Sequence, residues 1–174
     1  MNIPALFAEM DGRDRALFMR VALRARGRRS AKYFWTIVTH LGGAEVTIAA
    51  AVIPLFWSNV AAVGSNALLI LVLSHALVQM VKRSVGRPRP STSGDVTSVV
   101  AEPDRFSFPS GHSAASMAVA FGYAMAFPHL ALPLALIAFI VGASRVVLGV
   151  HFPGDVLIGQ LLAVITGIAL IALR

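Results

Sequence analysis

Long apolar runs dominate this sequence and constrain its fold more than any other feature. A helix needs about 20 apolar residues to cross the hydrocarbon core of a bilayer. Inside lipid every backbone amide and carbonyl must find a partner within the chain, so such runs are expected to be helical. The sequence therefore predicts an all-α, polytopic membrane helix bundle with about five transmembrane helices, near residues 36–57, 60–82, 112–127, 130–149 and 154–173.

The composition also indicates a membrane protein. Hydrophobic residues make up 57% of the chain and charged residues 13%, whereas soluble domains carry about 25% charged residues. The chain has no cysteine, which excludes disulfides, thiolate catalysis and cysteine-bound metals. The net charge of +7 could indicate nucleic acid, but the basic residues gather at the N-terminus and in one central loop. In a membrane protein this arrangement points to anionic headgroups or phosphate, so no nucleic-acid partner is expected.

The N-terminal segment, residues 1–35, is basic and amphipathic and differs from the rest of the chain. Its apolar residues recur near helical spacing, but it carries too many charges for a membrane span. We expect an interfacial helix there, interrupted at Asp11-Gly12, followed by a transmembrane domain over residues 36–174. The N-terminus lacks a basic run followed by an apolar run and a cleavage site, so no signal peptide is expected.

Counting the crossings puts nearly all polar side chains on one side of the membrane. The end of the second run, the long loop 83–109, the start of the third run and the turn between the last two runs share that side. Cations, histidines and a carboxylate inside or beside a membrane are costly and indicate function. The residues at this face are Lys82, Arg87, Arg89, Ser110, His112, Arg145, His151 and Asp155.

Several of these residue types suit a phosphoryl group. Lys82, Arg89 and Arg145 supply one ammonium and two planar guanidinium groups, which match phosphate oxygens. Ser110 adds a hydroxyl. Gly111 lets a backbone amide approach a ligand closely, at a helix N-terminus where anions bind.

The histidines suit nucleophilic and acid–base chemistry. His151 and Asp155 are four residues apart at the start of a predicted helix, so both can lie on one face. A carboxylate on one ring nitrogen would fix the tautomer and leave the other nitrogen free to attack. His112, on a different helix, is then available as a general acid for the leaving oxygen.

Three motifs formed by these residues resemble the signature of the type-2 phosphatidic acid phosphatase family, the membrane lipid phosphatase branch of a superfamily that includes vanadium haloperoxidases. They are K-x6-R-P from Lys82, P-S-G-H ending at His112, and S-R-x5-H-x3-D ending at Asp155. The resemblance covers roughly residues 36–174. It implies that His151 forms a phosphohistidine, that Asp155 orients it, and that His112 protonates the leaving group.

The same resemblance implies a phosphate-binding set and no metal ion or other cofactor. Many members of the family have six spans, whereas five are expected here, with the basic N-terminal segment in place of the first. The implied phosphate-binding residues are Lys82, Arg89, Ser110, Gly111 and Arg145.

Other polar residues have simpler interpretations. His75, in the second span, is expected to face the bundle interior, either as a packing residue or as a neighbour of the site. Arg87 is interpreted as a contact to lipid headgroups, and Asp104 in the long loop as a solvated charge. A zinc site built on the histidines and Asp155 is disfavoured, because three nearby cations would repel a metal.

The expected function is hydrolysis of a phosphomonoester or diphosphate on a membrane lipid, at a shallow site near the headgroups. Candidate substrates are a polyprenyl phosphate or diphosphate such as undecaprenyl diphosphate, phosphatidylglycerol phosphate and phosphatidic acid. Two alternatives stay open: a lipid phosphotransferase that uses the same residues, and a transporter whose basic cluster binds an anion. The absence of a charged path across the membrane argues against the transporter. The sequence gives no indication of the oligomeric state.

The chain is expected to be a multi-pass protein of the inner (plasma) membrane. Of its 15 Lys and Arg residues, eight lie in residues 13–32 and five in residues 82–105. Basic residues near span ends mark the cytoplasmic side, so this asymmetry favours a site that faces the cytoplasm. Many members of the resembled family work on the outer face of bacterial membranes, which favours the reverse.

Overall fold

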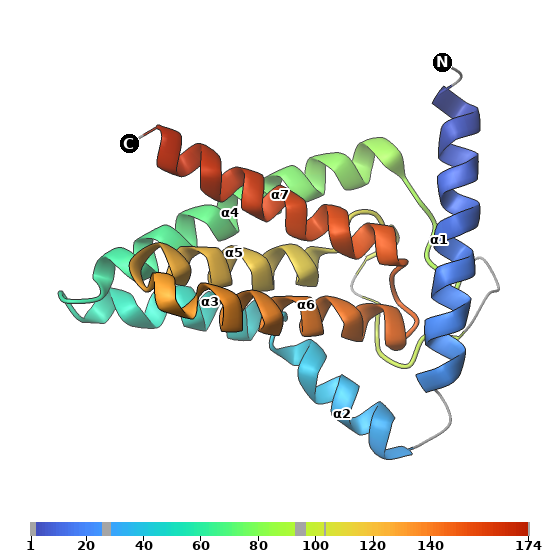
Figure 1. Ribbon diagram of the computed structural model, residues 1–174, viewed down its shortest axis with the longest axis horizontal. Coiled ribbons are helices and arrows are strands. Elements are labelled where there is room, and N and C mark those ends of the chain that lie inside the picture. Colours follow the sequence, from blue (N-terminus) through green and yellow to red (C-terminus); the bar gives the residue numbers. More distant parts are fainter. Residues whose placement is uncertain (1–2, 26–28, 93–96, 103, 174) are drawn as a thin grey trace.

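The computed structural model describes residues 3–25, 29–92, 97–102 and 104–173. Within these residues every secondary-structure element is a helix (Figure 1). The predicted all-α class is therefore confirmed. The elements in chain order are α1 (Ile3–Ala25), α2 (Arg29–His40), α3 (Ala44–Val52), the 3₁₀ helix η1 (Ile53–Phe56), α4 (Ala61–Val85), α5 (Gly111–Ala126), the 3₁₀ helix η2 (Pro128–Leu130), α6 (Ala131–Val147) and α7 (Pro153–Ala172).

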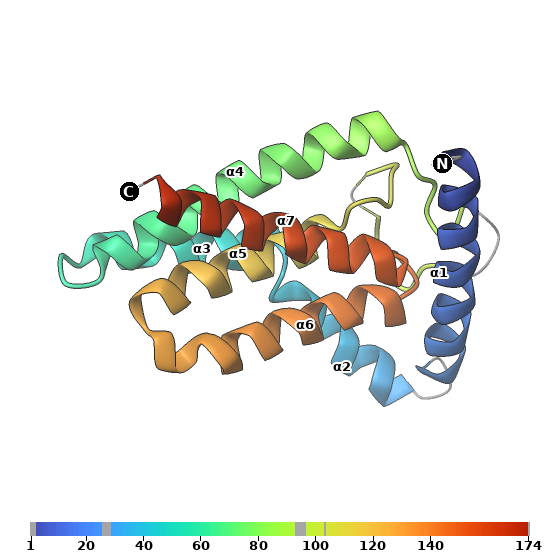
Figure 2. The same cartoon turned by 45° about the horizontal axis from the view of Figure 1, so that its top comes forward.

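Helix α5 lies at the centre of the bundle and packs against α4, α6 and α7 (Figures 1 and 2). Small residues permit this close packing. A Cβ atom on Gly122 of α5 would lie 2.5 Å from Cα of Ala67 on α4, so a larger residue would separate the two helices. Lipid supplies no hydrophobic force between helices, and close contact through small residues is the usual substitute.

Three helical units are long and apolar enough to cross a membrane: α4, η2 together with α6, and α7. A fourth crossing results if α2 and α3–η1 count as one bent span. Large apolar side chains such as Leu132, Leu157 and Ile168 are more than half exposed on the outside of the bundle, as expected of a surface that faces lipid. The chain is therefore a multi-pass membrane helix bundle.

The first apolar run differs from the single span expected over residues 36–57. The helix breaks after His40, and the segments before and after the break are bent by 41°. The break coincides with Gly42-Gly43. A Cβ atom on Gly42 would lie 2.9 Å from the backbone oxygen of His112 and 2.5 Å from Cγ1 of Val141, so the glycine brings this turn against α5 and α6.

Helix α1 is continuous, so the interruption expected at Asp11-Gly12 is wrong. One glycine inside a helix costs about 1 kcal/mol, which the packing of the rest of the helix can offset. In both views α1 runs across the end of the bundle where α6 ends and α7 begins (Figures 1 and 2). Its Phe18 and Ala22 are buried there against Phe152.

Candidate functional site

A cavity of about 780 Å³ brings the three motifs together. Its polar end is lined by Lys82 at the end of α4, Arg89 in the loop, Gly111 and His112 at the start of α5, and His151 before α7. Helix α4 ends at Gly86, whose φ of 63° is the left-handed conformation that glycine favours. The chain then turns back and carries Arg89 to the same place as Lys82.

His151 is almost fully buried, with 2% of its surface exposed. Its Nε2 lies 3.4 Å from Nη1 of Arg89, and its Nδ1 lies 3.6 Å from Oδ2 of Asp155. The second distance is longer than a hydrogen bond. Burial lowers the pKa of His151 to about 4, with Asp155 opposing this effect and Arg145 adding to it. The imidazole is therefore neutral at physiological pH, as an attacking nitrogen must be.

Asp155 is fully buried and both of its carboxylate oxygens have partners. Oδ2 accepts a hydrogen bond from the backbone amide of Phe152 at 2.9 Å, which closes the first turn of α7. Oδ1 accepts one from Nη1 of Arg87 at 2.7 Å. Arg87 therefore points into the protein, and its interpretation as a contact to lipid headgroups is wrong.

Asp104 lies between Lys82 and Arg89 with 38% of its side chain exposed, so it is a partly solvated charge, as expected, but also the partner of two cations. Nζ of Lys82 donates to Oδ2 of Asp104 at 2.6 Å, and Nη2 of Arg89 donates to Oδ1 at 2.8 Å. Burial opposes the charge of Asp104, but Lys82 and Arg89 outweigh it and hold the pKa of this carboxyl below its usual range. Two buried cations thus already bind one anionic group.

Arg145, in the last turn of α6, is 2% exposed and is not among the residues that line the cavity. Its Nη1 donates to Oγ1 of Thr39 at 2.6 Å, whereas its Nε and Nη2 are buried without a hydrogen-bond partner. A buried guanidinium group with unmade hydrogen bonds is costly. An anion with several oxygens would satisfy both nitrogens.

The start of α5 supplies the remaining predicted residues. Ser110 is fully buried; its backbone amide donates to the backbone oxygen of Asp155 at 2.9 Å, and its hydroxyl accepts from Ser113. Gly111 and His112 line the cavity. The N-terminus of a helix carries a partial positive charge, which adds to the cationic character of this end of the cavity.

The rest of the cavity is mostly apolar and extends along α4. Its α4 wall runs from Leu68 to Lys82, which is roughly 21 Å at the helical rise of 1.5 Å per residue. His75 and Gln79 also line it, with 3.2 Å between their Nε2 atoms. The site is therefore deeper than the shallow headgroup site expected from the sequence, and His75 lies beside the cavity rather than in the packed interior.

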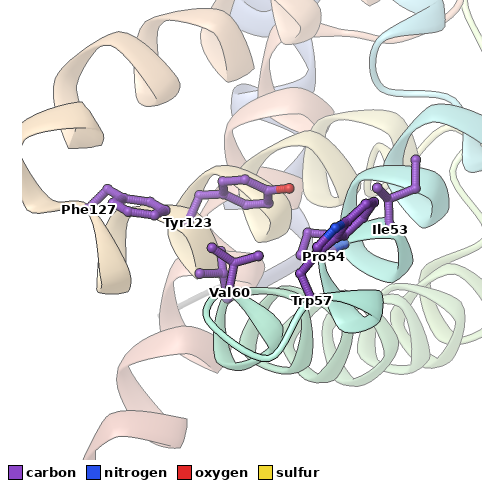
Figure 3. A pocket seen from close by; sticks show the side chains of 7 residues that line it. Ile53, Pro54, Trp57, Val60, Tyr123 and Phe127 are labelled. Atoms are coloured by element: carbon purple, nitrogen blue, oxygen red, sulfur yellow. The ribbon is translucent and has the colours of Figure 1, made fainter.

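A second cavity, of about 260 Å³, lies between η1, the start of α4 and the end of α5. Figure 3 shows its aromatic lining, which includes Trp57, Tyr123 and Phe127. The hydroxyl of Tyr123 donates to the backbone oxygen of Ala50. This cavity is lined by apolar and aromatic residues only, so the reactive groups gather at the other cavity.

The donor set of the larger cavity fits an anion. Within the described parts of the chain, no three His, Asp or Glu side chains gather in a group that could hold a metal ion. The same region holds Lys82, Arg89, Arg145 and the N-terminus of α5, all of them positive.

Known proteins similar to this chain are enzymes that act on phosphate groups. The sequence model of the PAP2 superfamily matches residues 63–174. The decaprenylphosphoryl-5-phosphoribose phosphatase of Mycolicibacterium smegmatis is 42% identical over 103 residues, which are 56% of this chain and 51% of that protein. A lipid A 1-phosphatase of Rhizobium johnstonii is 33% identical over 102 residues, 56% of this chain and 42% of that protein. The chain thus spans about half the length of the curated relatives it matches.

Two crystal structures resemble this chain over most of both lengths. LpxE from Aquifex aeolicus has a TM-score of 0.77 and 28% sequence identity, covering 88% of this chain and 92% of that chain. The PAP2-type phosphatidylglycerolphosphate phosphatase from Bacillus subtilis has a TM-score of 0.72 and 26% identity, covering 95% and 88%.

Proposed function

Because the chain belongs to the PAP2 superfamily, we propose that it is a membrane phosphatase that hydrolyses a phosphomonoester or diphosphate on a lipid. The observation that carries this proposal is the form of the cavity. One cavity, roughly 21 Å long along its α4 wall, joins a cationic end that contains two histidines to a mostly apolar part. A phosphate on an apolar tail matches both ends at once, whereas a water-soluble phosphate would leave the apolar part unused.

Phosphate binding is assigned to Lys82, Arg89 and Arg145, together with Ser110 and Gly111 at the start of α5. The phosphoryl group would replace the carboxylate of Asp104 between Lys82 and Arg89. Its oxygens would also satisfy the two unpartnered nitrogens of Arg145. These three cations supply the stabilisation of phosphoryl oxygens that a metal ion provides in other phosphatases.

The reaction is assigned to His151, His112 and Asp155. Nε2 of His151 attacks phosphorus, and the bond between phosphorus and the lipid oxygen breaks. His112 donates a proton to that oxygen, so the alcohol or the shortened phosphate leaves neutral or less charged. Water then attacks the phosphohistidine, which releases phosphate and restores the imidazole. Asp155 orients His151 and stabilises the cationic ring while phosphate is attached.

A direct test measures phosphate release by the full chain in detergent, with excess chelator present. We expect turnover of a long-chain lipid phosphate to persist in chelator, and kcat/KM to fall at least about 100-fold for the same headgroup without its tail, since each buried CH₂ contributes about 0.8 kcal/mol. A panel of polyprenyl phosphates, phosphatidylglycerol phosphate and phosphatidic acid then ranks the substrates. A strict requirement for a divalent ion, or equal rates with and without the tail, would contradict the proposal.

We infer five membrane crossings: the bent α2–α3–η1 segment, α4, α5, η2–α6 and α7, with α1 lying in the interface at the end that carries the site. Helix α5 has only 16 residues, but the surrounding helices shield much of it from lipid. The proposed domain boundary near residue 35 lies inside α2, so the first turns of α2 are assigned to the basic interfacial segment and the rest of the chain to the phosphatase domain.

We propose that the chain lies in the inner membrane with its site facing the cytoplasm. In the sequence, the basic cluster from Arg20 to Lys32 precedes most of the first proposed crossing, on the side of the site, and Arg174 is the one basic residue that follows the last crossing. With five crossings, the C-terminus lies across the membrane from the site. A reporter fused after Arg174 should therefore show alkaline phosphatase activity, and a green fluorescent protein fused there should stay dark. A fluorescent fusion without phosphatase activity would place the site outside.

A further inference from the structure

Arg87 lies between Lys82 and Arg89 in the chain but does not line the cavity. Its side chain is 15% exposed and is surrounded by carboxylates. Nη1 lies 2.7 Å from Oδ1 of Asp155 and 2.7 Å from Oδ2 of Asp14, and Nη2 lies 2.6 Å from Oδ1 of Asp11. Arg87 therefore connects the carboxylate next to the nucleophile with two carboxylates of α1.

The contact to Arg87 restricts Asp155 at the oxygen that faces away from His151. The other oxygen, Oδ2, is held by the amide of Phe152 and is the one 3.6 Å from Nδ1 of His151. With both oxygens bound, the carboxylate has one orientation. Without the bond to Arg87, a fully buried carboxylate oxygen of Asp155 would lose its cationic partner. Because an unpaired buried charge is unfavourable, Asp155 would then tend to rotate toward another donor or to bind a proton.

Helix α1 holds the same turn at two further points. Oδ1 of Asp14 accepts a hydrogen bond from the backbone amide of Gly154 at 2.7 Å. The ring of Phe152, next to His151, packs edge-on against Phe18 of α1 with 5.3 Å between centroids, and Arg87 lies over it with Cζ 4.1 Å from the centroid. The turn that carries His151 is therefore fixed from outside the transmembrane bundle.

We propose that Arg87 and Asp14 are positioning residues for the hydrolysis, acting through Asp155 on His151, and that α1 is thereby part of the catalytic unit. The inference rests on the proposed function. It concerns a helix outside residues 63–174, the region that the family model matches. A bidentate guanidinium is needed at this point because it reaches Asp155 and Asp14 through one nitrogen and Asp11 through the other, which an ammonium group on a lysine does not reproduce.

The test compares kcat and KM of Arg87→Gln, Arg87→Lys and Asp14→Asn with those of the full wild-type chain, and measures inhibition by inorganic phosphate. We expect Arg87→Gln to lower kcat by about 10–100-fold, the usual effect of removing a group that orients a reacting side chain. KM and the inhibition constant for phosphate should change by less than about 3-fold, an order-of-magnitude bound for leaving the phosphate-binding residues in place. Arg87→Lys should recover part of the loss, and Asp14→Asn should lower kcat by a smaller factor.

Arg83→Gln is the matched control, because Arg83 is an exposed arginine one turn earlier on α4. Adding Asp14→Asn to Arg87→Gln should lower kcat by a smaller factor than Asp14→Asn does in the wild type, since Asp14 acts partly through Arg87 and partly through the backbone amide of Gly154. A wild-type kcat in Arg87→Gln would overturn the inference. So would a loss in which KM and the phosphate constant rise in parallel with the fall in kcat, which indicates a general structural defect.

If Arg87→Gln does not fold, the inference is tested with Asp14→Asn and Arg87→Lys instead. A wild-type kcat in both of these variants would overturn it. The proposed function is judged separately, by the wild-type chain. A wild-type chain that releases no phosphate from any lipid in the panel overturns the function and the inference together. A wild-type chain that turns over normally beside unaffected Arg87 and Asp14 variants overturns the inference alone.

Discussion

His151→Ala is expected to lower phosphate release from a lipid substrate by at least about 10³-fold, the scale of loss when a covalent nucleophile is removed. The physical reason is that alanine leaves no group to form the bond to phosphorus, while the proposed phosphate-binding residues Lys82, Arg89 and Arg145 are unchanged. Turnover under saturating lipid, with the folded state of the variant checked by its elution in detergent, measures the effect.

His129→Ala is the matched control, because His129 is an exposed histidine in η2 at the opposite end of the bundle. It should retain wild-type turnover. Chemical trapping adds a second readout: wild-type protein quenched during turnover of a ³²P-labelled lipid should retain a label that is stable to alkali and labile to acid, as a phosphohistidine is. Retention of more than a few per cent of the activity in His151→Ala would mean that the covalent mechanism is wrong.

The transmembrane helices near the site were predictable because their limits are marked in the sequence. The run expected over residues 60–82 corresponds to α4, and those over 130–149 and 154–173 correspond to α6 and α7. Each is a long apolar stretch, and turn residues mark some of the limits: Gly86 follows α4 and Pro153 begins α7. Helix periodicity and the membrane requirement are local properties, so local sequence carries them.

The break in the first run was not predictable from hydropathy. Residues on both sides of Gly42-Gly43 are apolar, so the average hydropathy continues through the break. The bend exists because the turn packs against the backbone of His112 and the side chain of Val141, about 70 and 100 residues away in sequence. Contacts of that range leave no signal in the apolar pattern.

The residues proposed to react could be grouped from their motifs, but the residues that contact and orient them could not. Asp104 is a loop carboxylate with no local feature that distinguishes it from Glu102, and only folding of the loop brings it to Lys82 and Arg89. Asp14 is 73 residues from Arg87 in sequence. For Arg87 a signal existed, since it lies inside the K-x6-R-P motif, between two residues with proposed roles.

The second large effect is expected at His112. His112→Asn should lower turnover of an alkyl lipid phosphate by about 10²–10⁴-fold, because an alkoxide is a poor leaving group without a proton from a general acid. His112 lies at the start of α5 and lines the cavity together with His151, as the proposed proton transfer to the leaving oxygen requires. Asparagine keeps a polar side chain of similar reach but has no proton to donate at neutral pH.

A substrate with a good leaving group separates this role from phosphate binding. p-Nitrophenolate leaves without protonation, so the first turnover of p-nitrophenyl phosphate by His112→Asn should stay within about 10-fold of wild type, since the proton transfer that it lacks contributes little to that step. Later turnovers should be slow. After His112 has protonated the leaving oxygen, it is expected to act as the base that takes a proton from the water attacking the phosphohistidine, and asparagine cannot do this. Rapid-mixing measurements should therefore show a burst of one p-nitrophenolate per active site followed by a slow phase. A first turnover as slow as that of the alkyl lipid would mean that His112 binds the phosphoryl group rather than transferring a proton.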